Sequence, residues 1–216
     1  MRDLTTLKRL KKKYADFDIV FSALDTAYIE LEKLVENGEI ESEVLAETPQ
    51  FGELVLTEEM KNYDYIAFSD GACRGNPGPG AWGGLIQDNS GEIQFEGEGV
   101  EVSTTNNRME LEGAIACLKA LVDLAQENDG TPQMALYSDS KYVVDGFKSW
   151  MKGWKSRGWK KGDGKVPENV DLWQQLDTLG AQLPEIQFYW VKGHSGHPQN
   201  ERCDQIANKA LDEAGF

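Results

Sequence analysis

The chain has 216 residues, of which 40% are hydrophobic and 27% are charged, and its formal net charge is −15. This length allows one domain with a sizeable core and a modest extension, and the longest apolar runs are too short to span a membrane, which excludes an integral membrane protein. Three cysteines without a Cys-x-x-Cys pair indicate free thiols, and no apolar stretch follows the basic N-terminal residues, so we expect a cytoplasmic protein.

The first part of the chain, residues 1–62, has a helical pattern. Leucine spacing predicts a short basic helix at 4–10, and a second helix is predicted at 22–38, between a serine cap and a glycine stop. Residues 39–59 are acidic with little periodicity, so we interpret them as a linker or a loosely packed helix. We expect a monomer with a small helical extension of unknown role. Two roles stay open: a hairpin for dimerisation or partner docking, and a helical cap on the next domain.

The second part, residues 63–216, alternates between strands and helices. Apolar or alternating runs predict strands at 64–69, 80–87, 92–100, 133–138 and 186–191. Helical spacing predicts helices at 104–125, 140–161, 169–181 and 198–213. The Asn-Ser-Gly turn at 89–91 makes the second and third strands an antiparallel hairpin. Hairpins followed by strand-helix units predict an α/β fold, a mixed five-stranded sheet flanked by helices.

Four acidic residues mark the ends of these elements. Asp70 and Asp139 end two predicted strands of similar sequence, IAFSDG and ALYSDS. The carboxyl ends of parallel strands meet at one crevice, so these two acids are expected to lie close together. Glu110 lies near a helix start at the edge of its apolar stripe, and Asp204 lies in the last helix. Like charges about 4 Å apart repel by roughly 4 kcal/mol at an effective dielectric of about 20. Such a group takes up protons or binds divalent cations, and two Mg²⁺ would match its charge.

Each acid also has a simpler interpretation by itself. Aspartate after a strand often caps a turn or the next helix, and Glu110 suits a capping box. The loop before the last helix holds His194 between glycines, where an imidazole can shuttle protons. A zinc site of His194, His197 and Cys203 lacks a fourth ligand and a recognised spacing, so we expect His197 to be structural.

A basic segment at residues 148–165 stands out from the acidic chain. Seven basic side chains and the single acid Asp163 give it a local charge of +6. Three tryptophans are interleaved with these cations, as in grooves that bind phosphate and pack on sugar or base. The alternative is a surface helix anchored by tryptophan. After Asp70 comes the glycine-rich run GACRGNPGPGAWGG, which either lets a nucleic-acid backbone approach closely or forms a long hairpin turn.

Several runs together resemble one known family. FSDGACRGNPGPGAWG, TTNNRMELEGAI, YSDSKYVVDGF, WMKGWKSRGWK, NVDLWQQLD and WVKGHSGHPQNERCDQIA look like type 1 ribonuclease H in its bacterial form with a basic protrusion. The resemblance covers about residues 64–213. It implies a ribonuclease H-like fold and an endoribonuclease that hydrolyses the RNA strand of RNA/DNA hybrids by two-metal-ion catalysis, giving 5′-phosphate and 3′-hydroxyl products. Residues 1–62 do not resemble the hybrid-binding domain of some relatives.

The resemblance also implies roles for single residues. Asp70, Glu110, Asp139 and Asp204 would be catalytic and bind two Mg²⁺, for which Mn²⁺ can substitute, and His194 would assist turnover. The implied contacts to the RNA/DNA hybrid are Gly71, Cys73, Asn76, Thr105, Asn106, Asn107, Lys141, Trp150, Trp154, Lys155, Trp159 and Asn169. Two positions depart from the family: Ser103 replaces an arginine of the phosphate pocket, and Lys141 replaces a frequent glutamine.

Two other functions remain open at this point. The first is a module that binds hybrid or DNA on the same scaffold without catalysis. Loss of one of the four acids would indicate such a module, but all four are present. A polynucleotidyl transferase of the transposase or integrase type fits the acids, although it does not fit the basic segment or the histidine loop.

Overall fold

A computed structural model of the protein describes residues 54–128, 131–195 and 197–216, which belong to a compact unit that begins at Phe51. The helices expected at 4–10 and 22–38 lie outside the described residues. In the part of the chain that is described, no helix is long and apolar enough to cross a membrane.

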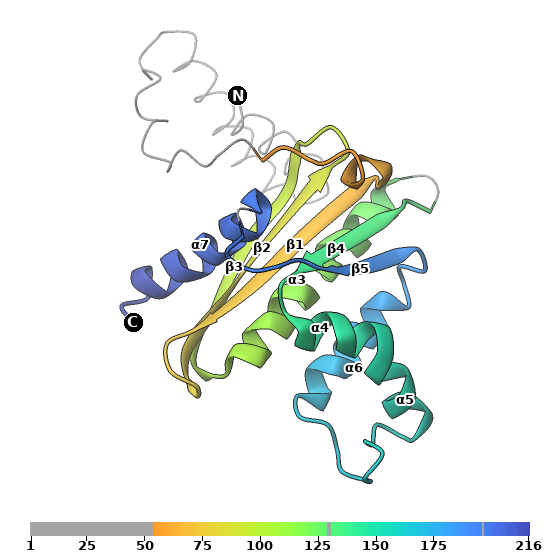
Figure 1. The fold of residues 1–216 in the computed structure, drawn as a ribbon, viewed down its shortest axis with the longest axis vertical. Coiled ribbons are helices and arrows are strands. Elements are labelled where there is room, and N and C mark those ends of the chain that lie inside the picture. The colour runs from red at the N-terminus through yellow and green to blue at the C-terminus, as the bar shows by residue number, and fades with distance from the viewer. Residues whose placement is uncertain (1–53, 129–130, 196) are drawn as a thin grey trace, which may run out of the picture. The chain divides into compact units, whose positions relative to one another are not determined.

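A mixed sheet of five strands forms the centre of this unit (Figure 1). The strands are β1 (Tyr65–Cys73), β2 (Gly78–Asp88), β3 (Ile93–Thr104), β4 (Met134–Ser138) and β5 (Ile186–Trp190), in the order β3-β2-β1-β4-β5. The first three strands form an antiparallel meander, whereas β4 and β5 run parallel to β1. The predicted α/β fold with a mixed five-stranded sheet is confirmed.

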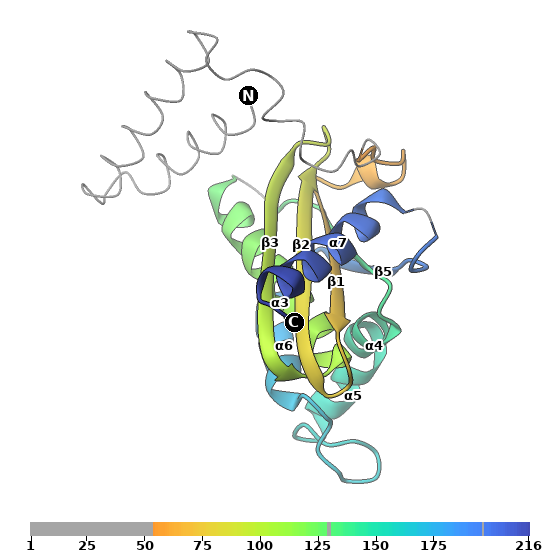
Figure 2. The ribbon, with the colours of Figure 1, turned by 90° about the vertical axis from the view of Figure 1, so that its left-hand side faces the viewer.

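Helices cover both faces of the sheet. They are η1 (Met60–Asn62), α3 (Asn106–Glu127), α4 (Lys141–Asp145), η2 (Gly146–Trp150), α5 (Met151–Ser156), α6 (Val170–Gly180) and α7 (Pro198–Glu213). Figure 2 shows α7 crossing one face, with α3 behind the other. Because strand side chains alternate between faces, Ala67 packs in the core with α3 and α6, while Ile66 and Phe68 pack with Cys203 of α7.

The helix predicted at 140–161 differs from the prediction in two ways. It is divided into α4, the wider π turn η2 and α5, and it ends at Ser156. At the start of η2, a Cβ on Gly146 would lie 2.0 Å from a ring carbon of Trp173, so only glycine fits this contact between helices. The chain then turns with positive φ at Gly158 and Trp159, which ends helical structure within the basic segment.

The compact unit starts before the boundary expected at Tyr63. Leu56 and Met60 are 5% and 4% exposed and pack with Phe68 and Tyr137. The end of the low-periodicity segment 39–59 is therefore part of the sheet domain.

Candidate active site

Three of the expected acids come together at one end of the sheet. Asp70 lies in β1, Glu110 in the first turns of α3, and Asp139 directly after β4, and their carboxylate oxygens lie within 4.8 Å of one another. We call these three residues the acid cluster. Glycine makes this approach possible, since a Cβ on Gly71 would lie 2.5 Å from the backbone nitrogen of Glu110. The packing of α3 on β1 thus places Glu110 beside Asp70.

Burial and mutual repulsion raise the pKa values of the acid cluster. Burial, followed by the charges of Asp139 and Asp204, raises the pKa of Asp70 to about 7. The pKa of Glu110 lies well above its usual value because of burial and the charges of Asp70 and Asp139, although a hydrogen bond from Asn106 opposes the shift. Without cations, the cluster therefore holds protons at neutral pH.

The donor set of the acid cluster fits a hard divalent cation. Carboxylate oxygens are the ligands that Mg²⁺ and Mn²⁺ prefer. Oε2 of Glu110 is buried without a hydrogen-bond partner, an arrangement that costs free energy unless a ligand occupies the position. The cluster is therefore built to accept a cation.

The fourth acid, Asp204, borders the acid cluster from α7. The group of three within 4.8 Å does not include it, and its Oδ1 accepts a hydrogen bond of 2.8 Å from Asn208. Its charge nevertheless contributes to the raised pKa values of Asp70 and Asp139. Asp204 thus lies in electrostatic contact with the cluster.

Asn200 of α7 is a site residue that the sequence analysis missed. It is 2% exposed, and its Nδ2 lies 3.4 Å from Oδ2 of Asp70 and 3.5 Å from Oδ2 of Asp139. Its Oδ1 is buried without a partner. Because Asn200 precedes Asp204 by one helical turn, the two share a helix face, and this spacing could have identified it. The amide links the two aspartates of the acid cluster.

The histidine loop lies against the acid cluster. A Cβ on Gly193 would lie 2.2 Å from Oδ2 of Asp139, so only glycine allows the loop this close. The exposed His194 has a φ of 49°, and its charge lowers the pKa of Asp139. His197 instead packs on Phe68 with ring centroids 5.4 Å apart, and burial lowers its pKa. Among the described residues, the metal-capable group consists of acids alone and includes no zinc set of histidine and cysteine.

Two expected substrate contacts flank the acid cluster directly. Asn106 donates a hydrogen bond of 3.2 Å to Oε1 of Glu110. Lys141 lies with its Nζ 4.8 Å above the ring of Trp190, whose Nε1 donates to the backbone oxygen of Asp139. Lys141 is therefore next to the cluster, although the family resemblance led us to expect glutamine at this position.

Further expected contacts surround the site at a greater distance. Cys73 and Asn76 lie at and after the end of β1, on the way to β2, and Asn107 is exposed in the first turn of α3. Thr105 is the residue that precedes α3. In the described part of the chain, the side chains of these four residues make no hydrogen bond or ring contact with the acid cluster.

Asn169 is held in a network at the start of α6. Its Oδ1 accepts a hydrogen bond of 3.3 Å from Arg108, and its Nδ2 donates to the hydroxyl of Tyr142 at 3.2 Å. Arg108 also pairs with Asp171 at 3.1 Å. The expected phosphate pocket therefore contains an arginine from α3, although position 103 is serine.

The basic segment divides into anchored and exposed tryptophans. Trp154 and Trp159 are half-buried against the main core, and Trp154 packs edge-on against buried Trp173 at 5.5 Å. Trp150 is 38% exposed. Lys155 forms an ion pair of 2.7 Å with Asp177. The two anchored indoles thus fit the alternative of a tryptophan-anchored surface helix, while Trp150 remains available to a ligand.

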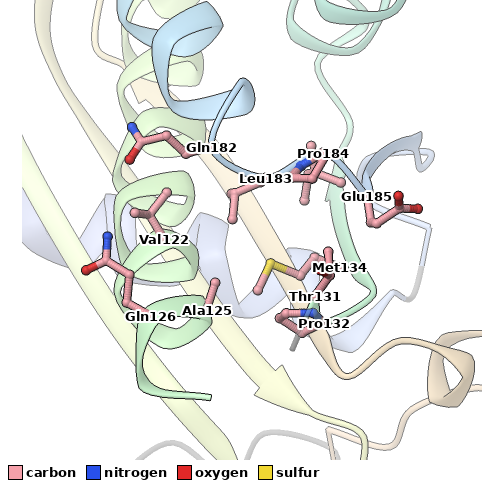
Figure 3. Close-up of a pocket in the computed structure, with 11 residues that line it drawn as sticks. Val122, Ala125, Gln126, Thr131, Pro132, Met134, Gln182, Leu183, Pro184 and Glu185 are labelled. Carbon is pink, nitrogen blue, oxygen red and sulfur yellow. The ribbon is translucent and has the colours of Figure 1, made fainter. Parts of the chain in front are cut away.

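A cavity of about 500 Å³ lies at the start of β4 (Figure 3). Val122, Leu183 and Ile186 are among the residues that line it, together with Met134, the first residue of β4. The acid cluster, by contrast, lies at the carboxyl end of β4. This cavity is therefore not part of the candidate active site.

Comparisons with known proteins agree with the geometry. The family model described as RNase H matches residues 62–212. A ribonuclease H from Alcanivorax borkumensis is 51% identical over 155 residues, which cover 71% of this chain and 94% of that protein.

Solved structures give the same result. LC9-RNase H1, described as a type 1 RNase H with the type 2 active-site motif, is 32% identical with a TM-score of 0.59, over 69% of this chain and 72% of its own. LC11-RNase H1 in complex with RNA/DNA hybrid is 25% identical with a TM-score of 0.55, over 69% and 98%.

Proposed function

The chain belongs to the type 1 ribonuclease H family, and we propose that it hydrolyses the RNA strand of RNA/DNA hybrids. The observation that carries this proposal is the acid cluster, in which three carboxylates from distant parts of the chain lie within 4.8 Å inside the fold of this family. The relatives' names give no support to a transferase or to a binding module without catalysis.

Asp70, Glu110 and Asp139 would hold the cations, with Asp204 as the fourth acid at the edge of the site. Two Mg²⁺ bound there, or Mn²⁺ in their place, would supply an acidified attacking water and a stabilised leaving 3′-oxygen, which gives 5′-phosphate and 3′-hydroxyl ends. The side chains provide orientation and charge, and no side chain acts as nucleophile. Asn200 would keep the two aspartates in a fixed relation through its amide.

His194 would carry protons during turnover. It is exposed, and it lies on a loop that approaches Asp139 closely at Gly193. Its charge lowers the pKa of Asp139. An imidazole titrates in the range where proton transfer at neutral pH is efficient.

Hybrid recognition would use both strands. The chemical difference between them is the ribose 2′-hydroxyl, which needs polar groups near the scissile phosphate. Asn106 and Lys141 lie next to the acid cluster, and we propose Gly71, Cys73, Asn76 and Asn107 as the remaining contacts to the RNA side.

The DNA strand would bind on the other side of the site. Thr105 and Asn169, supported by Arg108, would bind one of its phosphates. The basic segment, with Trp150, Trp154, Lys155 and Trp159, would lie along its backbone.

The setting of the enzyme follows from its thiols. Cys73, Cys117 and Cys203 are all free. Free thiols persist in a reducing compartment, so we propose that the enzyme acts in the cytoplasm. We also propose that it acts as a monomer.

The test is cleavage of a labelled RNA/DNA hybrid in Mg²⁺. We expect the wild type to cut the RNA strand, to leave a DNA duplex intact, and to produce 3′-hydroxyl ends that a polymerase can extend. Asp70→Asn should abolish cleavage, whereas the matched control Asp123→Asn, an exposed position on α3, should keep it. Absence of cleavage by the wild type would end the proposal.

A further inference from the structure

Residues 54–63, which we call the strap, pack on the sheet beside α7. The core on this face includes Leu56 and Met60 of the strap, which are 5% and 4% exposed, together with Phe68 and Tyr137. The family match starts at residue 62, so nearly all of the strap precedes the part shared with the family. The strap is therefore a feature of this chain that the family resemblance does not explain.

Two buried glutamines tie the strap to α7. Nε2 of Gln199 lies 3.2 Å from the backbone oxygen of Val55 and 3.2 Å from Oε1 of Gln87. Gln87 in turn donates to the backbone oxygen of Leu54 at 3.0 Å. Both glutamines are 1% exposed. In so buried a place, loss of either amide would leave backbone acceptors without partners.

The strap also supports the row of side chains next to the acid cluster. The rings of Phe68, Tyr137 and Tyr189 stack across β1, β4 and β5, with centroids 5.2 Å and 5.0 Å apart. Asp70 follows Phe68 by two residues on β1, so their side chains share a face, and Asp139 follows Tyr137 by two residues, directly after β4. A shift of this aromatic row would therefore reach the aspartates.

The start of α7 is also restrained by the packing of His197 on Phe68 and by the ion pair of Arg202 with Glu96. His197, the residue before the helix, makes no side-chain capping bond. The next residues are Gln199, tied to the strap, and Asn200, whose amide reaches Asp70 and Asp139 at 3.4 Å and 3.5 Å. These last distances are long for hydrogen bonds, so a small rotation of the turn would break them.

We propose that the strap is a positioning element of the active site, and that Gln199 is the positioning residue that transmits its effect. In this arrangement the strap's backbone fixes Gln199, Gln199 fixes the first turn of α7, and that turn holds Asn200 against two members of the acid cluster. The inference rests on the proposed ribonuclease H function for its kinetic consequence, but its structural consequence can be measured without substrate.

The first test breaks the tie in the full chain. Gln199→Met keeps the size of the side chain but removes its amide, and Gln87→Met breaks the same network from the sheet side. For each variant we expect kcat to fall about tenfold, which corresponds to about 1.4 kcal/mol, with KM for the hybrid within twofold of the wild type.

The matched control is Gln182→Met. Its amide also donates to a backbone oxygen, that of Thr178, but the residue is exposed and lies after α6. This variant should keep kcat. A loss of thermal stability in Gln199→Met with unchanged kcat, measured well below the unfolding temperature, would show a merely structural role and overturn the proposal.

The second test needs no turnover. Met60→Ala in the full chain loosens the strap without touching α7, and amide hydrogen exchange is measured without hybrid or metal. We expect the amides of residues 201–204 to exchange at least tenfold faster, and those of 115–121 in α3 to keep their rates. Equal acceleration in both helices, or none in α7, would contradict the proposal. If the wild type failed to cut hybrid while α7 responded as expected, the proposed function would fail and the strap's effect on α7 would stand.

Discussion

The acid cluster and the basic segment both concentrate charge, but they hold it differently. Asp70 and Glu110 are 7% and 5% exposed, and their neighbours are fixed by strand pairing and by glycine contacts. In the basic segment the charges are at the surface, Lys155 pairs with Asp177, and the attachment to the core comes from half-buried indoles. Buried charges are expensive and therefore strongly shifted in pKa, whereas exposed ones are screened by salt. Chemistry and binding are thus expected to respond to different perturbations.

The largest effect is expected where a buried acid is neutralised. Glu110→Gln removes a proposed cation ligand, so kcat should fall on the order of 10³-fold. Thermal stability without divalent cations should not fall, because glutamine resembles the protonated acid that the raised pKa of Glu110 favours. Glu127→Gln, at the exposed end of the same helix, is the control and should retain activity. Comparable losses in the two variants would argue against the site.

The next effect is a dependence of stability on pH in metal-free protein. The pKa of Asp70 is raised from 3.8 to about 7, so the folded state binds this proton more tightly than the unfolded state. The resulting stabilisation is complete below about pH 4 and is lost as the pH rises through about 7. It amounts to on the order of 4 kcal/mol. Unfolding temperatures between pH 5 and pH 8 with a chelator should fall less steeply for Asp70→Asn than for the wild type, and Mg²⁺ should restore wild-type stability at pH 8. Parallel slopes would contradict this assignment.

A smaller effect separates the two kinds of tryptophan in the basic segment. Trp150→Ala removes a ring that is 38% exposed and contacts Tyr142 and Trp154 at its edge, so we expect KM for the hybrid to rise about 3–10-fold and the unfolding temperature to fall less than in Trp154→Ala. Trp154→Ala removes a ring packed on Trp173 and should cost about 2–4 kcal/mol of stability. Hybrid binding at two salt concentrations and thermal unfolding of both variants provide the check. Equal stability losses would mean that Trp150 is also an anchor.

The sequence predicted the parts of the site that local pattern determines. Asp70 and Asp139 end strands with nearly the same spelling, and helical spacing turned Glu110 inward, so the acid cluster was expected before the structure was known. Asp204 was expected in the same group, but its carboxylate lies at the edge and bonds to Asn208. The difference arises because helical spacing predicts which way a side chain points, but it does not predict its distance from the other acids to within a few ångströms.

Other features depend on contacts between distant residues. The strap is held by the buried side chains of Leu56 and Met60 and by hydrogen bonds from two glutamines to its backbone. It therefore does not need a periodic apolar face, and its sequence shows none. Glycine is required at position 146, where the π turn begins, by the approach of Trp173, which follows many residues later. Neither partner can be identified from local sequence, so these parts could not be predicted.

The smallest expected effect concerns the position where the chain departs from its family. Ser103 is exposed at the end of β3, and Arg108 already lies beside Asn169 but is shared with Asp171. Ser103→Arg should therefore add only part of a phosphate contact, so we expect KM for the hybrid to fall about 2–5-fold. The dependence of log affinity on log salt should steepen by about one, because one more phosphate is neutralised. Ser103→Gln adds length without charge and should do neither. An unchanged KM and salt slope in Ser103→Arg would show that the phosphate pocket does not bind the DNA strand. The basic segment would then be the proposed surface for that strand.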